Sequence, residues 1–366
     1  MIYLWITWLF WPFFKRRIRP EVADWRHVAL VQTAKIGDMV CTLPLIEALS
    51  AHGTALDVYH APLTTGLLAH DPRINRRFAL TPQAWRGWAG KWALAQQLRA
   101  ARYDAIVLAS INLPWILIAA WAGIPVRMAV SPDAPSRSME WARTWLTHDL
   151  PHQRHQLILD EWRLLLHTVG RTLPHTKEVH CSPSMSVAAL VSSQLGATRA
   201  VGLGISAGNT LKALDIRTLI EVVNGLIAGG VERVVLVGTA ADQPIAAQIL
   251  AGTQTPERVW NSCGQFDLDE IGELLRSLAL YVGVDSGMTY LADALGVPVV
   301  SVVGPTEPRE QRPLDRRARF VIENLSCYPC AFVHHTPHHC HRGDRACITR
   351  VSAARIVEQS LEGWRE

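Results

Sequence analysis

Residues 280–303 read LYVGVDSGMTYLADALGVPVVSVV, and this stretch decides the fold class. Its two apolar runs, residues 280–284 and 297–303, predict buried strands, and the alanine-rich pattern of residues 288–295 predicts a helix between them. A strand, a helix and another strand in this order form one unit of a parallel sheet that helices cover on both faces.

The turn between the first strand and the helix combines an acid, a hydroxyl and a glycine, in Asp285, Ser286 and Gly287. Parallel sheets place their ligands at the carboxyl ends of strands, where this turn lies. The amides at the start of the following helix carry a partial positive charge that suits a phosphate. Residues 304–308, GPTEP, close the next strand on the same side, so this edge of the sheet is predicted to bind phosphate.

Outward from this stretch, strands and helices alternate through both halves of the chain. In the first half, the pattern predicts strands at residues 27–32, 56–60, 104–109 and 124–130, and helices at 38–51, 83–101 and 155–168. In the second half, it also predicts strands at residues 200–205 and 233–237, and helices at 215–228, 267–277 and 352–364. The polar residues 171–186 form the candidate linker.

A chain of 366 residues, 49% of them hydrophobic, is too long for a single core, so two domains are expected. The predicted architecture is α/β. It comprises a membrane-interface segment at 1–20, two Rossmann-like domains at 21–175 and 186–350, and a C-terminal helix at 351–366. The net charge of +4 permits an anionic substrate or membrane surface, and no motif typical of nucleic-acid binding is present in the sequence.

Two glycine-containing loops follow the first predicted strand of each half. Residues 33–44 read TAKIGDMVCTLP, in which Gly37 lets the backbone approach a bound group and Asp38 is either a functional carboxylate or simply a helix cap. Residues 202–212 read GLGISAGNTLK, and their amides, hydroxyls and Lys212 suit a pyrophosphate. The alternative for the second loop is an ordinary turn with a solvated lysine.

Taken together, these motifs resemble glycosyltransferase family 9, the ADP-heptose:lipopolysaccharide heptosyltransferases, from about residue 28 to about residue 356. The resemblance implies a GT-B fold, in which two facing Rossmann-like domains enclose a central cleft, and an inverting mechanism that needs no cofactor for catalysis. It also implies that Asp38 is the general base, and that Lys212, assisted by Thr210, stabilises the diphosphate leaving group.

The resemblance places the donor at several further positions of the second half. Asp285, Ser286 and Gly287 match the turn that binds the donor diphosphate. Asp242 falls where the family often has an acid near the donor ribose, and Phe266 falls near the position that contacts the base.

Two positions depart from the family pattern. Tyr290 stands where the family usually has histidine, and Leu214 stands where a tryptophan is frequent. A tyrosine can donate a hydrogen bond to a phosphate, but it carries no positive charge near neutral pH. The departure leaves open a different donor, slower chemistry or a scaffold role.

The N-terminal segment, residues 2–14, is almost wholly apolar and rich in tryptophan, and a basic cluster follows it. The residues concerned are Trp5, Trp8, Trp11, Lys15, Arg16, Arg17 and Arg19. The run is shorter than a spanning helix, and a secretory signal would carry its charge before the apolar run. An interfacial membrane anchor is therefore predicted, and the alternative is a segment that packs on the protein itself.

Four of the seven cysteines form a cluster in a histidine-rich loop: Cys327, Cys330, Cys340 and Cys347. Four soft ligands led by a Cys-x-x-Cys pair suit a structural zinc or iron site. The alternative is a set of free or disulfide-bonded thiols. A similar cysteine pattern occurs in many family 9 sequences.

The function predicted from the resemblance is inverting transfer of heptose from ADP-heptose to a lipid-linked core oligosaccharide. The enzyme would act peripherally at the cytoplasmic face of the bacterial inner membrane. The alternatives are a protein acceptor, a non-catalytic scaffold and a sugar-nucleotide epimerase. For three arginines of the first half, the sequence leaves open either a contact with acceptor phosphates or a solvated basic face: Arg73, Arg76 and Arg77.

Overall fold

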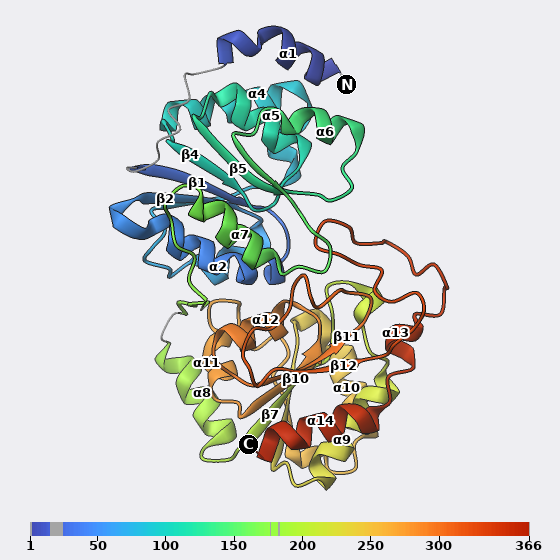
Figure 1. Cartoon of the computed structure of the whole chain (residues 1–366). Coiled ribbons are helices and arrows are strands. Elements are labelled where there is room, and N and C mark those ends of the chain that lie inside the picture. Colours follow the sequence, from blue (N-terminus) through green and yellow to red (C-terminus); the bar gives the residue numbers. More distant parts are fainter. Residues whose placement is uncertain (1, 15–24, 176, 182–183, 366) are drawn as a thin grey trace. The chain divides into compact units, whose positions relative to one another are not determined.

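The computed structural model describes residues 2–14, 25–175, 177–181 and 184–365. The chain divides into two compact units, unit 1 (Met1–Lys177) and unit 2 (Glu178–Glu366), each with a parallel sheet of its own (Figure 1). The predicted basic cluster at residues 15–19 lies outside the described residues.

The sheet of unit 1 has six parallel strands in the order β3-β2-β1-β4-β5-β6. The strands in chain order are β1 (His27–Gln32), β2 (Ala55–His60), β3 (Arg76–Ala79), β4 (Ala105–Leu108), β5 (Val126–Ser131) and β6 (His148–Pro151). This is the strand order of a dinucleotide-binding domain, whose connections leave β1 and β4 toward opposite sides.

Helices cover both faces of this sheet. In chain order they are α1 (Ile2–Phe14), α2 (Ile36–Ser50), α3 (Thr65–Leu68), α4 (Gly87–Ala101), α5 (Leu113–Ala122), α6 (Arg137–Arg143) and α7 (Ile158–His167). Figure 1 shows α4, α5 and α6 over one face and α2 and α7 over the other. The hydrophobic core on the first side is rich in aromatic residues and includes the fully buried Trp115 and Trp121 of α5.

The sheet of unit 2 repeats the same topology, with the order β12-β11-β10-β7-β8-β9 and every pair parallel. The strands are β7 (Ala200–Gly204), β8 (Arg233–Val237), β9 (Val259–Asn261), β10 (Leu280–Val284), β11 (Val299–Val303) and β12 (Arg319–Ile322). Two α/β units with parallel sheets are therefore present, as the strand and helix patterns predict.

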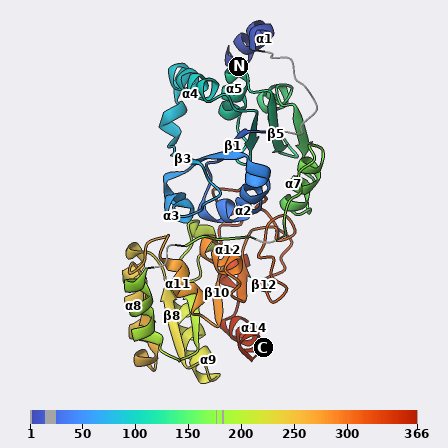
Figure 2. The ribbon, with the colours of Figure 1, turned by 90° about the vertical axis from the view of Figure 1, so that its left-hand side faces the viewer.

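The helices of unit 2 again form two layers (Figure 2). They are α8 (Met185–Leu195), α9 (Ile216–Ala228), α10 (Gln243–Gly252), α11 (Ile271–Arg276), α12 (Gly287–Ala294), α13 (Ala346–Thr349) and α14 (Ala353–Arg365). α14 packs against α9 and the β10–β12 edge, so the C-terminal helix belongs to the core of unit 2. Gly225 and Gly229 allow this close approach, because a Cβ at either would meet Val357 or Leu361 below 3 Å.

The N-terminal segment forms α1, and one side of it packs on unit 1. Leu4 and Thr7 are fully buried, and the Trp121 indole N–H donates a 2.7 Å hydrogen bond to the Thr7 hydroxyl. None of the helices in the described parts of the chain has the length and apolar character needed to cross a membrane.

Candidate active site

The predicted motifs of unit 2 meet where β7 and β10 lie side by side in the sheet. The loop that carries Lys212 follows β7, and Asp285 is the first residue after β10. These two strands flank the point at which the strand order reverses, and sheets of this kind bind ligands outside that point. The topology thus places both motifs at the expected ligand-binding edge.

Lys212 and Asp285 form an ion pair at this edge, with 2.5 Å between Lys212 Nζ and Asp285 Oδ2. The carboxylate is buried, and the lysine side chain is partly accessible. Burial opposes ionisation of Asp285, but the charge and hydrogen bond of Lys212, together with hydrogen bonds from neighbouring side chains, outweigh it and hold the pKa of that carboxyl below its ordinary value. A buried carboxylate therefore fixes the position of the one cation predicted to face the diphosphate.

Tyr290 supports the same carboxylate from inside α12. Its hydroxyl donates a 2.7 Å hydrogen bond to Asp285 Oδ1 and lies 3.2 Å from the Gln311 carbonyl oxygen. The side chain is buried, so the residue that replaces the family histidine contacts Asp285 rather than the surface of the site. This geometry gives Tyr290 a supporting contact with Asp285, and its predicted contact with the donor stays a prediction.

The turn that carries Lys212 is the short 3₁₀ helix η4 (Thr210–Lys212), and it is held from two directions. The Asn209 side chain accepts a 3.0 Å hydrogen bond from the Leu211 amide. From the other direction, Arg345 Nη1 donates to the Thr210 carbonyl at 2.6 Å and lies 3.5 Å from the Ala213 carbonyl. Arg345 was not anticipated, because it lies 135 residues from Thr210 in the sequence and in no recognised motif.

The turn of Ser286 and Gly287 begins α12. Within the described structure the Ser286 hydroxyl does not cap this helix, so it is available to a ligand at the helix start. The amides of the first turn and this hydroxyl are the donors that suit a phosphate oxygen.

The glycines at the start of the second loop have a packing explanation. A Cβ at Gly204 would lie 2.3 Å from the Tyr281 hydroxyl oxygen, and a Cβ at Gly202 would lie 2.5 Å from Leu278. Both glycines lie in β7 and make room for core side chains of unit 2. Gly208, further along the loop, faces open space.

Asp242 and Phe266 follow the neighbouring strands β8 and β9. Asp242 Oδ2 accepts hydrogen bonds from the Ser206 hydroxyl at 2.9 Å and from the Thr239 amide and hydroxyl at 2.7 Å each. Phe266 is half-buried and packs edge to face against Trp260, with 6.0 Å between the ring centroids. Asp242 thus ties the loops after β7 and β8 together, which is a structural role beside the predicted ribose contact.

In unit 1, a short loop after β1 leads into α2, and Asp38 is the third residue of that helix. Asp38 Oδ2 accepts a 3.1 Å hydrogen bond from the Lys35 amide, so the carboxylate does cap the helix. The loop is fixed by Gln32, whose side chain bonds the Ala34 amide and the Thr42 hydroxyl. The N-cap is Lys35 rather than Asp38, and the Asp38 carboxylate bonds back to it as a capping box does. The half-buried carboxylate also lies near the carboxyl end of β1, so its catalytic role stays a prediction.

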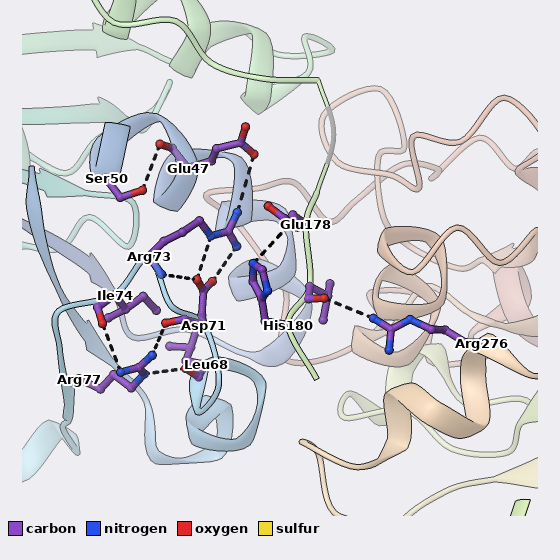
Figure 3. A network of polar contacts seen from close by, with 11 residues as sticks. Glu47, Ser50, Leu68, Asp71, Arg73, Ile74, Arg77, Glu178, His180 and Arg276 are labelled. Atoms are coloured by element: carbon purple, nitrogen blue, oxygen red, sulfur yellow. Dashed lines mark hydrogen bonds and ion pairs between the residues drawn. The ribbon is translucent and has the colours of Figure 1, made fainter. Parts of the chain in front are cut away.

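The three arginines considered for acceptor phosphates have partners inside unit 1. Figure 3 shows Arg73 paired with Asp71 at 2.7 Å and reaching toward Glu47 at 3.7 Å. Arg77 donates to backbone carbonyls of the same loop (Figure 3). Arg76 pairs at 2.7 Å with the fully buried Asp57. Arg73 and Arg77 thus hold the loop before β3, and Arg76 joins β3 to β2 while its side chain stays about half exposed. A contact of these arginines with acceptor phosphates stays a prediction.

The four clustered cysteines line one open pocket of unit 2, with an empty volume of about 530 Å³. In the described parts of the chain, no disulfide joins any of the cysteines. Burial and the neighbouring thiols raise the pKa of Cys347 to about 11. Burial opposes ionisation of Cys340, but the amides of residues 342, 343 and 345 hold the pKa of that thiol below its ordinary value. Among the described residues, no three Cys, His, Asp or Glu side chains stand in a metal-holding arrangement.

Comparisons with known proteins identify the family of the chain and proteins of similar fold. The sequence model described as "Glycosyltransferase family 9 (heptosyltransferase)" matches residues 91–340. The lipopolysaccharide heptosyltransferase 3 of Escherichia coli is 26% identical over 286 residues, which cover 76% of this chain and 83% of that protein. The solved structure of the E. coli ADP-heptose lps heptosyltransferase II has a TM-score of 0.69 at 21% identity, covering 93% of this chain and 98% of that chain.

A family 9 glycosyl transferase from Veillonella parvula also matches, with a TM-score of 0.74 at 14% identity over 94% of this chain and 98% of that chain. At these identities the structural likeness concerns the fold alone. Together with the two parallel six-stranded sheets, it confirms the predicted GT-B fold class.

Proposed function

Because this chain belongs to glycosyltransferase family 9, as the match over residues 91–340 shows, we propose that it transfers heptose from ADP-heptose to a lipopolysaccharide core acceptor. The chain is a glycosyltransferase, and the resemblance found in its three motifs is confirmed. The names of the relatives indicate the donor and the class of acceptor. The side chains of Asp38 and Lys212, which follow β1 and β7, carry the proposed chemistry.

In the proposed reaction, the acceptor hydroxyl attacks the anomeric carbon of the donor sugar. A glycosidic bond forms, the bond from the anomeric carbon to the diphosphate breaks, and ADP leaves with the electron pair. Asp38 accepts the proton of the attacking hydroxyl, and the configuration at the anomeric carbon is inverted. Lys212 stabilises the negative charge that develops on the leaving diphosphate.

The observation that carries this proposal is the ion pair of Lys212 with the buried Asp285. A cation that is fixed in advance needs little reorganisation when charge develops on the leaving group, which is the main source of electrostatic catalysis. Thr210, Ser286 and Gly287 add neutral donors around the same diphosphate. Asp242 is assigned to the ribose and Phe266 to the base.

The test is a transfer assay with purified protein, ADP-heptose and a soluble core oligosaccharide, in which the release of ADP is measured. Lys212→Ala should lower kcat by about 100-fold, since it removes the leaving-group cation. Asp38→Asn should lower kcat by about 100-fold or more while ADP still raises the Tm. Arg217→Ala, an exposed residue on α9, is the matched control and should leave kcat unchanged.

A panel of ADP, UDP, GDP and CMP identifies the nucleotide. A nucleotide at about 100 times its Kd stabilises the folded state by about 2.7 kcal/mol, which is a measurable rise in Tm. Stabilisation by ADP that Lys212→Ala abolishes is the expected result. Stabilisation by UDP or GDP instead would replace the donor, and no stabilisation by any nucleotide would contradict the donor-site assignment.

For the cell, the proposal places the enzyme peripherally at the cytoplasmic face of the inner membrane, acting on a lipid-linked acceptor. A deletion strain should lose core heptose from its lipopolysaccharide. Intact lipopolysaccharide, together with loss of sugar from a protein, would instead favour the protein acceptor.

The cysteine cluster is proposed as a structural zinc or iron site, apart from the chemistry of transfer. The support is the donor set, four thiols around one pocket, with Cys340 the most easily ionised of those whose pKa is shifted. The described arrangement does not itself hold a metal, so binding requires the thiols to converge. Elemental analysis of the purified protein tests this, with Cys327→Ser/Cys330→Ser as the variant that should lose the metal.

A further inference from the structure

α1 has two unlike sides. One side is anchored on unit 1, where Leu4 and Thr7 are fully buried and Thr7 accepts the hydrogen bond of the Trp121 indole. The other side exposes Trp5, Trp8 and Leu9, with 58%, 57% and 64% of their surface accessible. Their spacing of three and four residues places Trp8 and Leu9 beside Trp5 on the exposed part of the helix.

Aromatic side chains of α4 and α6 also contact α1. Tyr3 of α1 stacks on Trp88 of α4, with 5.7 Å between ring centroids, and Trp88 itself is 41% exposed. Trp141 of α6 packs edge to face against Trp5 at 5.2 Å. We call Trp5, Trp8, Leu9 and Trp88 the tryptophan face. It is assembled from segments about 80 residues apart, and α1 contributes to it as a docked helix.

Positive charge borders this face. Lys91 Nζ lies 4.9 Å from the centre of the Tyr3 ring, and Arg86 is exposed just before α4. In the sequence, Lys15, Arg16, Arg17 and Arg19 follow α1 within five positions. Basic residues beside an apolar surface attract anionic lipid headgroups.

Tryptophan is the side chain that prefers the boundary between headgroups and hydrocarbon, because its ring is apolar and its N–H is polar. A helix of 13 residues is about 20 Å long, shorter than the hydrocarbon core of about 30 Å, so α1 fits the plane of the interface. Exposed apolar patches of this kind mark interaction sites in folded proteins.

We infer that the tryptophan face docks unit 1 onto the surface of an anionic lipid bilayer, with α1 lying in the plane of the membrane. This inference specifies which surface would make the proposed peripheral contact with the membrane. It rests on the proposed function in one respect: the contact would hold the enzyme near a lipid-linked acceptor. The contact belongs to the folded unit, so its orientation on the bilayer is set by the anchoring of Leu4 and Thr7.

The test is co-sedimentation of the full chain with vesicles of phosphatidylcholine containing phosphatidylglycerol, compared with phosphatidylcholine alone. The wild-type protein should bind the anionic vesicles more strongly. Trp5→Ser/Trp8→Ser should lower the partition coefficient by about tenfold or more, and Trp88→Ser should lower it by a smaller factor. Leu164→Ser, which removes an equally exposed side chain from α7, is the matched control and should bind as the wild type does.

Unchanged binding of Trp5→Ser/Trp8→Ser would overturn the inference. Unchanged binding of Trp88→Ser would overturn the composite face and leave α1 alone as the anchor. The wild-type protein could fail to bind vesicles and instead form a dimer that the α1 substitutions dissociate. That result would overturn the inference and show that the tryptophan face binds a second copy of this chain. Stabilisation by ADP and transfer to a soluble acceptor are measured without vesicles, so failure of the proposed function is seen separately.

Discussion

Lys212 and Asp285 lie 73 residues apart in the sequence, yet their side chains form a 2.5 Å ion pair beyond the carboxyl ends of β7 and β10. The carboxylate is buried and receives a second hydrogen bond from Tyr290 on its other oxygen. A lysine held in this way keeps its charge in one place, at the edge of the sheet that is proposed to bind the donor. Three of the predictions below examine how this lysine is held.

Replacing the carboxylate should impair turnover more than binding. Asp285→Asn leaves Lys212 with a neutral partner and removes the ion pair that orients it, so kcat should fall by about 10- to 100-fold. Tyr290→Phe keeps the ion pair and removes one hydrogen bond, so its loss should be smaller. Steady-state kinetics measure both, and an Asp285→Asn enzyme as active as the wild type would contradict the positioning role.

The same pair predicts a dependence of stability on pH. The pKa of Asp285 is lower in the folded chain than its ordinary value of 3.8, so the folded state favours the ionised form. The stabilisation is therefore present above that ordinary value and is lost as the pH falls through the lower folded value. The Tm difference between wild type and Asp285→Asn should be largest near neutral pH and shrink in acid. A difference that grows in acid would reverse the assigned sign.

Arg345 should act on donor binding through the turn that it holds. Arg345→Ala removes the hydrogen bond to the Thr210 carbonyl, so the Lys212 turn loses one of its two attachments and the KM for the donor should rise by about tenfold. Arg345→Lys retains a cation and should recover part of the loss. Arg350→Ala, an exposed arginine five residues later, is the control. Equal effects of Arg345→Ala and Arg350→Ala would exclude a specific role.

Gly204 should be intolerant of a side chain for reasons of packing. A Cβ there would lie 2.3 Å from the Tyr281 hydroxyl oxygen, so Gly204→Ala should lower the free energy of unfolding by about 1–3 kcal/mol. Gly208→Ala, where nothing lies within 4 Å of the added Cβ, should be close to neutral. Adding Tyr281→Phe to Gly204→Ala should restore part of the loss. Urea unfolding measures all three, and equal losses at Gly204 and Gly208 would exclude the packing explanation.

The thiols should react with iodoacetamide at different rates near neutral pH. Cys340 should be alkylated faster than Cys347, because three amides favour its thiolate while burial and neighbouring thiols raise the pKa of Cys347 to about 11. Cys263 is buried, its pKa is raised to about 12, and it should remain unmodified until the chain unfolds. Peptide mass spectrometry over time gives the order, and the opposite order would contradict the assigned environments.

The buried parallel strands were predictable because their apolar runs stand out against the helices between them. β1 and β8, for example, begin and end at the predicted residues. α5 was missed because it is buried on every side, and a helix without a polar face shows no periodicity. β3 and β12 were missed because each is a four-residue edge strand with at most one buried residue, so neither shows a clear apolar run.

The site followed the same division. Lys212 and Asp285 were found from local motifs, since each loop carries its own composition signal. The contacts between them could not be found, because they depend on the order of strands in the sheet. The hold of Arg345 on the Lys212 turn spans 135 residues and has no local signal. Likewise, the composition near Arg73 suggested a basic surface, whereas the fold supplies acidic and carbonyl partners nearby.

The strand order has a consequence for synthesis of the protein. Each sheet is built only from strands that are consecutive in the chain, β1 to β6 in one and β7 to β12 in the other. All of the strands of unit 1 have therefore left the ribosome before the first strand of unit 2 is translated. Domains generally fold as units during translation, the N-terminal one first, so unit 1 can complete its core before unit 2 is synthesised. A ribosome that stalls on the messenger RNA within the coding region of unit 2 should already carry a folded, protease-resistant unit 1.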